Sequence, residues 1–157
     1  QKHVPNALVM LAPYVNSYRR LTQAASAPVN NKWGYDNRTT AFRVPRSDPA
    51  GRRVENRIPS SDANPYLALA ASLACGLIGM TNKAKAEPPV LTTANEDQID
   101  LPRGLLEAVD LFESDRELAA VLGTSFATTY AAIKRAEFET FMEVISPWER
   151  EYLLLNV

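Results

Sequence analysis

The sequence predicts an α+β fold in which a small antiparallel sheet precedes a helical second half. The part up to about residue 61 consists of short β-leaning runs separated by prolines and turn residues, a pattern typical of strands. Beyond it, apolar residues recur three and four positions apart, which is typical of amphipathic helices. We therefore expect one domain over residues 1–157, with a sheet part (about 1–61) and a helical part (about 62–157).

Three strands are expected in the first part, at residues 30–35, 39–44 and 52–58. Asp36-Asn37 marks a turn between the first two, because short polar side chains hydrogen-bond the turn backbone. A proline-rich polar stretch separates the second strand from the third. The chain opens on what looks like the end of a helix, so we expect it to be a piece of a longer protein.

The second part is expected to form helices at about 64–80, 105–114, 115–122, 126–141 and 147–155. Asn64 is a good N-cap and is followed by a proline, which suits the first helical position. Gly123 is a natural helix stop. Ser146 and Glu149 have the spacing of a capping box. The amphipathic face of the fourth helix is marked by Phe126, Tyr130, Ile133, Glu137 and Phe141. The aromatic residues of this helix that are expected in the core are Phe126, Tyr130, Phe138 and Phe141.

Composition limits the class of protein. At 46% hydrophobic and 22% charged residues, the chain is neither disordered nor membrane-spanning. No apolar run reaches the roughly 18 residues that a spanning helix needs. The single cysteine, Cys75, cannot form an internal disulfide and is expected in the core, so we expect a cytoplasmic protein. His3, the only histidine, is expected to be a surface or packing residue.

Positive charge is concentrated in residues 16–58, and nearly all of it is arginine. The arginines of this segment are Arg19, Arg20, Arg38, Arg43, Arg46, Arg52, Arg53 and Arg57. Arginine grips carboxylate and phosphate groups with a planar fork, so the segment favours binding of a fixed anion. A nucleic-acid partner is not expected, because no basic helix, RNA-binding motif or zinc-knuckle spacing accompanies the arginines.

The most specific pattern is Arg53-x-Glu55-x-Arg57, whose alternation places all three side chains on one face of the third strand. A carboxylate between guanidiniums stays ionised and could hold a divalent metal while the arginines bind anions, which suits phosphoryl transfer. A structural ladder of ion pairs explains the pattern equally well. Arg38 and Arg43 fall on opposite faces by strict alternation, so a shared site would need a bulge or a strand end between them.

Five stretches, in order along the chain, closely resemble motifs of the glutamine synthetase family. They are residues 16–21 (Asn-Ser-Tyr-Arg-Arg-Leu), 27–29 (Ala-Pro-Val), 37–45 (from Asn-Arg-Thr to Arg-Val-Pro), 52–57 (Arg-Arg-Val-Glu-Asn-Arg) and 62–67 (Asp-Ala-Asn-Pro-Tyr-Leu). A looser likeness extends over the helical tail. By this resemblance the chain is identified as the C-terminal portion of a glutamine synthetase-type catalytic domain.

The resemblance implies an ATP-dependent ligase that joins L-glutamate to ammonia or an amine through γ-glutamyl phosphate, with Mg²⁺ (or Mn²⁺). By motif position, Arg38 would be catalytic, Arg20 and Arg57 would bind glutamate, Arg43 and Arg53 would bind ATP, and Glu55 would be a metal ligand. The family also implies a homo-oligomer, with further metal ligands supplied from upstream sequence. We therefore expect this piece to be inactive alone.

Two departures from the family pattern bear on this expectation. Ammonia-using members carry a glutamate in a Gly-Tyr-Glu-Ala-Pro stretch, and Ser26 stands in its place here. Serine is neutral and a poor base, which favours an organic amine, such as a polyamine, as the acceptor. A basic residue before the Arg-Arg pair is replaced by Ala50-Gly51, which could alter the nucleotide contact. The alternative function is a non-catalytic relative with a structural or regulatory role, against which Glu55 and its arginines argue.

Overall fold

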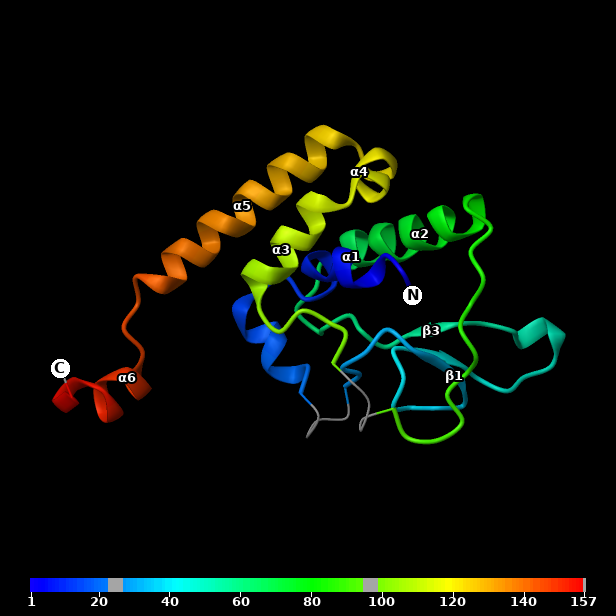
Figure 1. Cartoon of the computed structure of the whole chain (residues 1–157), viewed down its shortest axis with the longest axis horizontal. Helices are drawn as coiled ribbons and strands as arrows, with labels where there is room; N and C mark the ends of the chain where they lie inside the picture. Colours follow the sequence, from blue (N-terminus) through cyan, green and yellow to red (C-terminus); the bar gives the residue numbers. More distant parts are fainter. Residues whose placement is uncertain (23–26, 95–98, 157) are drawn as a thin grey trace.

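The computed structural model describes residues 1–22, 27–94 and 99–156. Figure 1 shows the larger helices gathered on one side of a small sheet, with the C-terminal helix apart from them. The elements are α1 (Val4–Leu11), η1 (Val15–Arg20), β1 (Trp33–Tyr35), β2 (Phe42–Val44), η2 (Pro49–Gly51), β3 (Glu55–Asn56), α2 (Pro65–Thr81), α3 (Leu105–Ser114), α4 (Arg116–Leu122), α5 (Thr124–Met142), α6 (Pro147–Tyr152) and η3 (Leu154–Asn156). The predicted α+β class is confirmed.

The sheet has the order β1-β2-β3 and is mixed, which corrects the expectation of a wholly antiparallel sheet. β2 and β3 are antiparallel, but β1 and β2 are parallel. The connection between them is therefore not a hairpin turn, which joins antiparallel strands. Within this connection the Asn37 side chain accepts a hydrogen bond from the Thr39 N–H (3.0 Å). A Cβ on Gly34 would lie 2.9 Å from the Asn37 Cβ, so glycine permits this close return.

The helix signals in the second half are confirmed. The Asn64 side chain caps α2 by accepting hydrogen bonds from the N–H groups of Tyr66 (3.0 Å) and Leu67 (3.3 Å). Gly123 separates α4 from α5 with a φ of 95°, a conformation that L-residues with a side chain rarely adopt. The predicted capping box forms at α6, where the Ser146 N–H donates to Glu149 Oε2 (2.7 Å).

Helix α1 lies at the centre of the core. Val4 and residues 7–11 are at most 1% exposed, and the helix packs against both α2 and α3. Leu105, Val109 and Phe112 of α3 are buried against this core, as their spacing predicted. Burying such a side chain contributes about 1.5–3 kcal/mol, so this cluster accounts for much of the stability of the fold.

His3 is a buried packing residue that links α1 to α4. Its Nδ1 lies 2.6 Å from Oδ2 of Asp115, and its Nε2 lies 3.3 Å from Oε2 of Glu117. Asp115 also caps α4, because its Oδ1 accepts a hydrogen bond from the Leu118 N–H (2.9 Å). One carboxylate therefore fixes the start of α4 and also the start of α1, which His3 precedes.

No helix in the ranges that the structure describes combines the length and the apolar character needed to cross a membrane.

Candidate functional site

Arg43 and Glu55 face each other across β2 and β3. The two residues are Cα partners in the antiparallel ladder, and Arg43 Nη1 donates to Glu55 Oε2 over 2.9 Å. The second nitrogen, Nη2, donates to Oδ1 of Asp36 over 3.2 Å. These hydrogen bonds, first the one to Glu55, raise the pKa of Arg43 above its ordinary value. The cross-strand ion pair expected of a ladder is thus present, and it orients both side chains.

Arg57 approaches the other oxygen of the same carboxylate. Its Nε lies 3.7 Å from Glu55 Oε1, and the Arg57 side chain is only 17% exposed. Its Nη1 also donates to the backbone carbonyl oxygens of Arg38 and of Thr40, the latter over 3.3 Å. The Glu55 carboxylate therefore has a guanidinium group near each of its oxygens.

Arg53 does not join this cluster, although the strand alternation predicted that it would. The strand β3 covers only Glu55–Asn56, so Arg53 lies before the strand and its side chain need not share a face with Glu55. Its Nη1 donates to the Gly51 carbonyl oxygen over 3.0 Å, and the residue is exposed. The opposite face of this segment is directed toward the helices, as alternation predicted: Asn56 donates to the Ser72 hydroxyl of α2 (3.0 Å), and Ile58 is fully buried.

Arg38 is exposed and lies in the turn before β2, which begins at Phe42. The alternation that separates it from Arg43 therefore does not apply, since only Arg43 is in the strand. The backbone of Arg38 is tied to the cluster, because its carbonyl oxygen accepts from Arg57. The structure therefore has a strand end between the two arginines, which is one of the two arrangements that were predicted for a shared site.

Arg20 ends η1 and points at the segment after β3. Its Nη2 donates to the backbone carbonyl oxygen of Ile58. Burial lowers the pKa of Arg20, the Asp62 carboxylate acts in the opposite direction, and the nearby positive charge of Arg57 lowers this pKa further. Its hydrogen bond to Ile58, the residue that follows Arg57, places Arg20 at the edge of the same cluster.

Two guanidinium nitrogens of the cluster are buried without a hydrogen-bond partner among the described residues. They are Nε of Arg20 and Nε of Arg43. A buried donor without an acceptor is costly, so an oxygen-rich anion that supplied acceptors would be stabilised there. Carboxylate and phosphate groups both fit this requirement.

Glu55 is the carboxylate that was predicted to bind a metal ion, and it lies between Arg43 and Arg57. Within residues 1–22, 27–94 and 99–156, no three His, Cys, Asp or Glu side chains gather in a way that could hold a metal. The described residues therefore fit one ligand of an oxygen-rich cation site.

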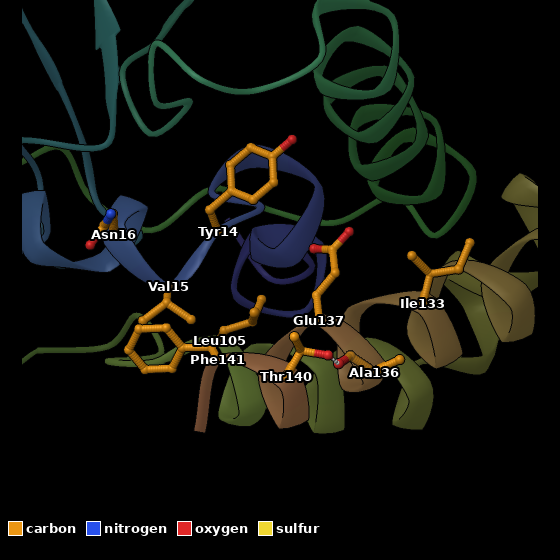
Figure 2. Close-up of a pocket in the computed structure, with 9 residues that line it drawn as sticks. All are labelled: Tyr14, Val15, Asn16, Leu105, Ile133, Ala136, Glu137, Thr140 and Phe141. Carbon is orange, nitrogen blue, oxygen red and sulfur yellow. Dashed lines mark hydrogen bonds between the residues drawn. The ribbon is translucent and has the colours of Figure 1, made fainter. Parts of the chain in front are cut away.

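A separate groove of about 610 Å³ lies between η1, α3 and α5, and Figure 2 shows the side chains around it. Its lining is mainly apolar and contains none of the predicted site residues; it consists of Tyr14, Val15, Asn16, Leu105, Ile133, Ala136, Glu137, Thr140 and Phe141. Phe141 is 44% exposed here, so the expectation that it packs in the core is wrong. The buried residues of α5 are instead Ala127, Ala131 and Lys134, so the face that packs on the core differs from the predicted one.

Sequence reasoning missed two acidic residues around the arginines. Asp36 binds Arg43, and its only signal was its place in a predicted turn. Asp62 accepts a hydrogen bond from the Ser17 hydroxyl of η1 over 2.9 Å. Its signal was its position at the start of the stretch 62–67, which resembles a family motif. Ser26, on which the expectation about the acceptor rests, lies outside the described residues.

Comparison with known proteins gives consistent matches over nearly the whole chain. The family model for the catalytic domain of glutamine synthetase matches residues 1–153. The glutamate–isopropylamine ligase of a Pseudomonas species is 38% identical over 141 residues, covering 87% of this chain and 31% of that protein. The glutamine synthetase of Methanocaldococcus jannaschii is 36% identical over 162 residues, covering 97% of this chain and 36% of that protein.

A solved structure described as a GmaS/ADP complex superposes on this chain with a TM-score of 0.84 at 34% identity, covering 98% of this chain and 37% of the other. The chain spans about a third of the length of these relatives. A family model that covers most of the chain, together with sequence and structural similarity of this extent, shows that the chain belongs to the glutamine synthetase family.

Proposed function

We propose that the protein is an ATP-dependent ligase that joins the γ-carboxyl group of L-glutamate to ammonia or an organic amine. The observation that carries this proposal is the cluster of Arg43, Glu55 and Arg57 on and after adjacent strands, with Arg20 beside it. Guanidinium groups fixed in one place suit a reaction whose substrates are carboxylates and phosphates. Membership of the glutamine synthetase family supports the same reaction class.

Arg20 and Arg57 would bind glutamate. Both are partly buried and close enough to interact electrostatically, so a carboxylate between them would relieve their repulsion. The buried Nε of Arg20 would gain an acceptor in the same step. Fixed guanidinium pairs of this kind orient a carboxylate as well as bind it.

Arg43 and Arg53 would bind the phosphates of ATP, and Arg38 would act near the transferred phosphoryl group. Arg43 already has a fixed orientation and a buried Nε without a partner among the described residues. Arg53 and Arg38 are exposed, so their side chains would turn toward the cluster when ATP binds. Their contribution would be neutralisation of charge on the phosphoryl group as it moves.

Glu55 would supply one oxygen ligand to Mg²⁺ or Mn²⁺, with the remaining ligands lying outside the described residues. When bound, such an ion neutralises phosphate charge and orients phosphate oxygens. Arg43 and Arg57 fix the orientation of the Glu55 carboxylate, since each lies on a different oxygen. The metal would therefore bind an oriented ligand.

The reaction would proceed in two steps. A γ-carboxylate oxygen of glutamate attacks the γ-phosphorus of ATP, the bond to the β-phosphate oxygen breaks, and ADP leaves with that electron pair. The amine nitrogen then attacks the carbonyl carbon of γ-glutamyl phosphate, and inorganic phosphate leaves as the C–N bond forms. The nitrogen loses a proton to a base. Arg20 and Arg57 hold glutamate through both steps.

The acceptor is proposed to be an organic amine. Ser26 stands where ammonia-using members of the family carry a glutamate, and a similar protein is named for isopropylamine. The test is ADP release by the full-length gene product with ATP, Mg²⁺ and glutamate, comparing ammonium with a panel of mono- and polyamines. Release that depends on an amine supports the proposal. Strong release with ammonium would identify an ammonia ligase, and no release with any acceptor from folded protein would overturn the enzyme function.

Self-association is proposed as well. Beyond α5 the chain exposes large apolar side chains, including Ile145 at 62%, Trp148 at 58% and Leu155 at 93%. Figure 1 shows this end apart from the other helices. Light scattering of the full-length gene product would test the proposal, because a monomer at micromolar concentration contradicts it.

A further inference from the structure

The 3₁₀ helix η1 is held at both ends by one short segment, residues 58–62, that follows β3. At the first turn, the Ser17 hydroxyl donates to Oδ2 of Asp62 over 2.9 Å. At the last turn, Arg20 donates to the carbonyl oxygen of Ile58. Because the same segment continues from Arg57, it connects the two arginines that are proposed to bind glutamate. The position of Arg20 relative to Arg57 therefore depends on how η1 sits on this segment.

Ser17 connects η1 to residues 58–62 through its hydroxyl group. It is 4% exposed, and its hydroxyl oxygen accepts a hydrogen bond from the Tyr14 N–H (3.1 Å) while donating to Asp62. The acceptor is an ionised carboxylate, which makes this hydrogen bond stronger than one between neutral groups. The other oxygen of Asp62 accepts a hydrogen bond from the Ser60 hydroxyl, which lies outside η1.

Charge acts in the same direction as this hydrogen bond. Arg57 repels Arg20, whereas Asp62 attracts it. Burial acts to raise the pKa of Asp62, but the hydrogen bonds from Ser60 and Ser17 and the charge of Arg20 lower it overall. The carboxylate is thus ionised near neutral pH and opposes the displacement of Arg20 away from Arg57.

We propose that Asp62 is a positioning residue for glutamate binding: through Ser17 and through its charge it holds η1 so that Arg20 stays beside Arg57. This inference rests on the proposed function, since it assumes that Arg20 and Arg57 bind glutamate. Asp62 acts through Ser17 and Arg20 and has no contact with the substrate in this account. Its loss therefore weakens glutamate binding without affecting ATP binding or the chemical step.

The test compares three variants of the full-length gene product. Asp62→Ala removes the acceptor of Ser17 and should raise the KM for glutamate about tenfold, with kcat and the KM for ATP within about twofold of the parent. Asp62→Asn keeps an acceptor oxygen for Ser17 but loses the charge that attracts Arg20, so its KM for glutamate should lie between those of the parent and of Asp62→Ala. Ser60→Ala removes the other hydrogen bond to Asp62 but leaves the one from Ser17, and is the matched control.

Hydrogen exchange over residues 14–21 supplies a readout that does not need activity. Asp62→Ala should increase deuterium uptake in this peptide alone, whereas Asp62→Asn and Ser60→Ala should not. Unchanged uptake, or uptake that rises over the whole chain, overturns the inference. Local uptake with an unchanged KM for glutamate also overturns it. If the parent has no glutamate-dependent activity, the proposed function fails, and exchange still decides whether Asp62 holds η1.

Discussion

Replacing Glu55 by glutamine separates the two explanations of the arginine cluster. The change removes one negative charge and keeps the shape of the side chain. Arg43 keeps Asp36 at 3.2 Å, and Arg57 keeps the Thr40 carbonyl oxygen at 3.3 Å, so neither guanidinium is left without an acceptor. If Glu55 serves only in an ion-pair ladder, stability is all that can change. If it is a metal ligand, activity changes far more.

The structure sets the expected magnitudes. The Glu55 side chain is 43% exposed, and ion pairs that are exposed to this extent contribute little to stability. We therefore expect Glu55→Gln to lower the melting temperature by less than about 3 °C. Losing a metal ligand removes several kcal/mol of charge stabilisation in the transition state, so activity should fall by more than about a hundredfold.

The assay is thermal unfolding and ADP release on the same preparation of the full-length gene product. Glu113→Gln is the matched control, because Glu113 is a carboxylate of 41% exposure that is paired with Arg135, outside the cluster. It should give a similarly small change in melting temperature and no loss of activity. A Glu55→Gln variant that keeps activity within about tenfold and melts more than about 10 °C lower would refute the metal-ligand role.

Two further predictions concern the fold. Gly34→Ala places a Cβ 2.7 Å from the Val90 carbonyl oxygen, so it should lower the free energy of unfolding in urea by about 1–3 kcal/mol. Gly76→Ala lies within α2 and its Cβ would have nothing within 4 Å, so it should raise the free energy of unfolding by about 0.5–1 kcal/mol. Equal effects would contradict the close packing at Gly34. Burial acts to raise the pKa of Asp115, but hydrogen bonds from the Leu118 N–H and from His3 lower this pKa overall. The ionised Asp115 carboxylate should therefore stabilise the fold fully above pH 3.8, the ordinary pKa of the group, and this contribution to the free energy of unfolding should be lost as the pH falls below 3.8. Acid titration of the parent and of Asp115→Asn, which should lack this loss, checks the second prediction.

Local signals predicted the helices well because their causes are local. Asn64 caps α2 through hydrogen bonds to residues two and three positions away, and Ser146 and Glu149 cap α6 in the same way. Gly123 ends α4 because the backbone there needs a positive φ. Each of these features can be recognised within a few residues of sequence.

The strand directions could not be predicted, and the choice between a surface and a packing position for His3 stayed open, because both depend on distant partners. β1 and β2 are parallel, and the return of the chain after β1 brings both Asn37 and the carbonyl oxygen of Val90 against Gly34. His3 is buried because Asp115, 112 positions later, binds its ring. Neither contact produces a periodic pattern of apolar residues from which it could be predicted.

The candidate site was predicted in part. Alternation grouped Glu55 with Arg57, and the antiparallel register then brought Arg43 opposite Glu55. The role of Arg53 remains a prediction, since the strand is too short to hold it on the same face. Asp62 was missed because its importance comes from Ser17, 45 positions earlier.

The protein is proposed to activate glutamate by phosphorylating its γ-carboxyl group. The most direct measurement uses glutamate with ¹⁸O in that group, ATP, Mg²⁺ and the best acceptor, with the full-length gene product. Mass spectrometry of the released phosphate should show one ¹⁸O per molecule, because the attacking carboxylate oxygen leaves with the phosphate. Phosphate released together with amide product but without ¹⁸O would contradict the account.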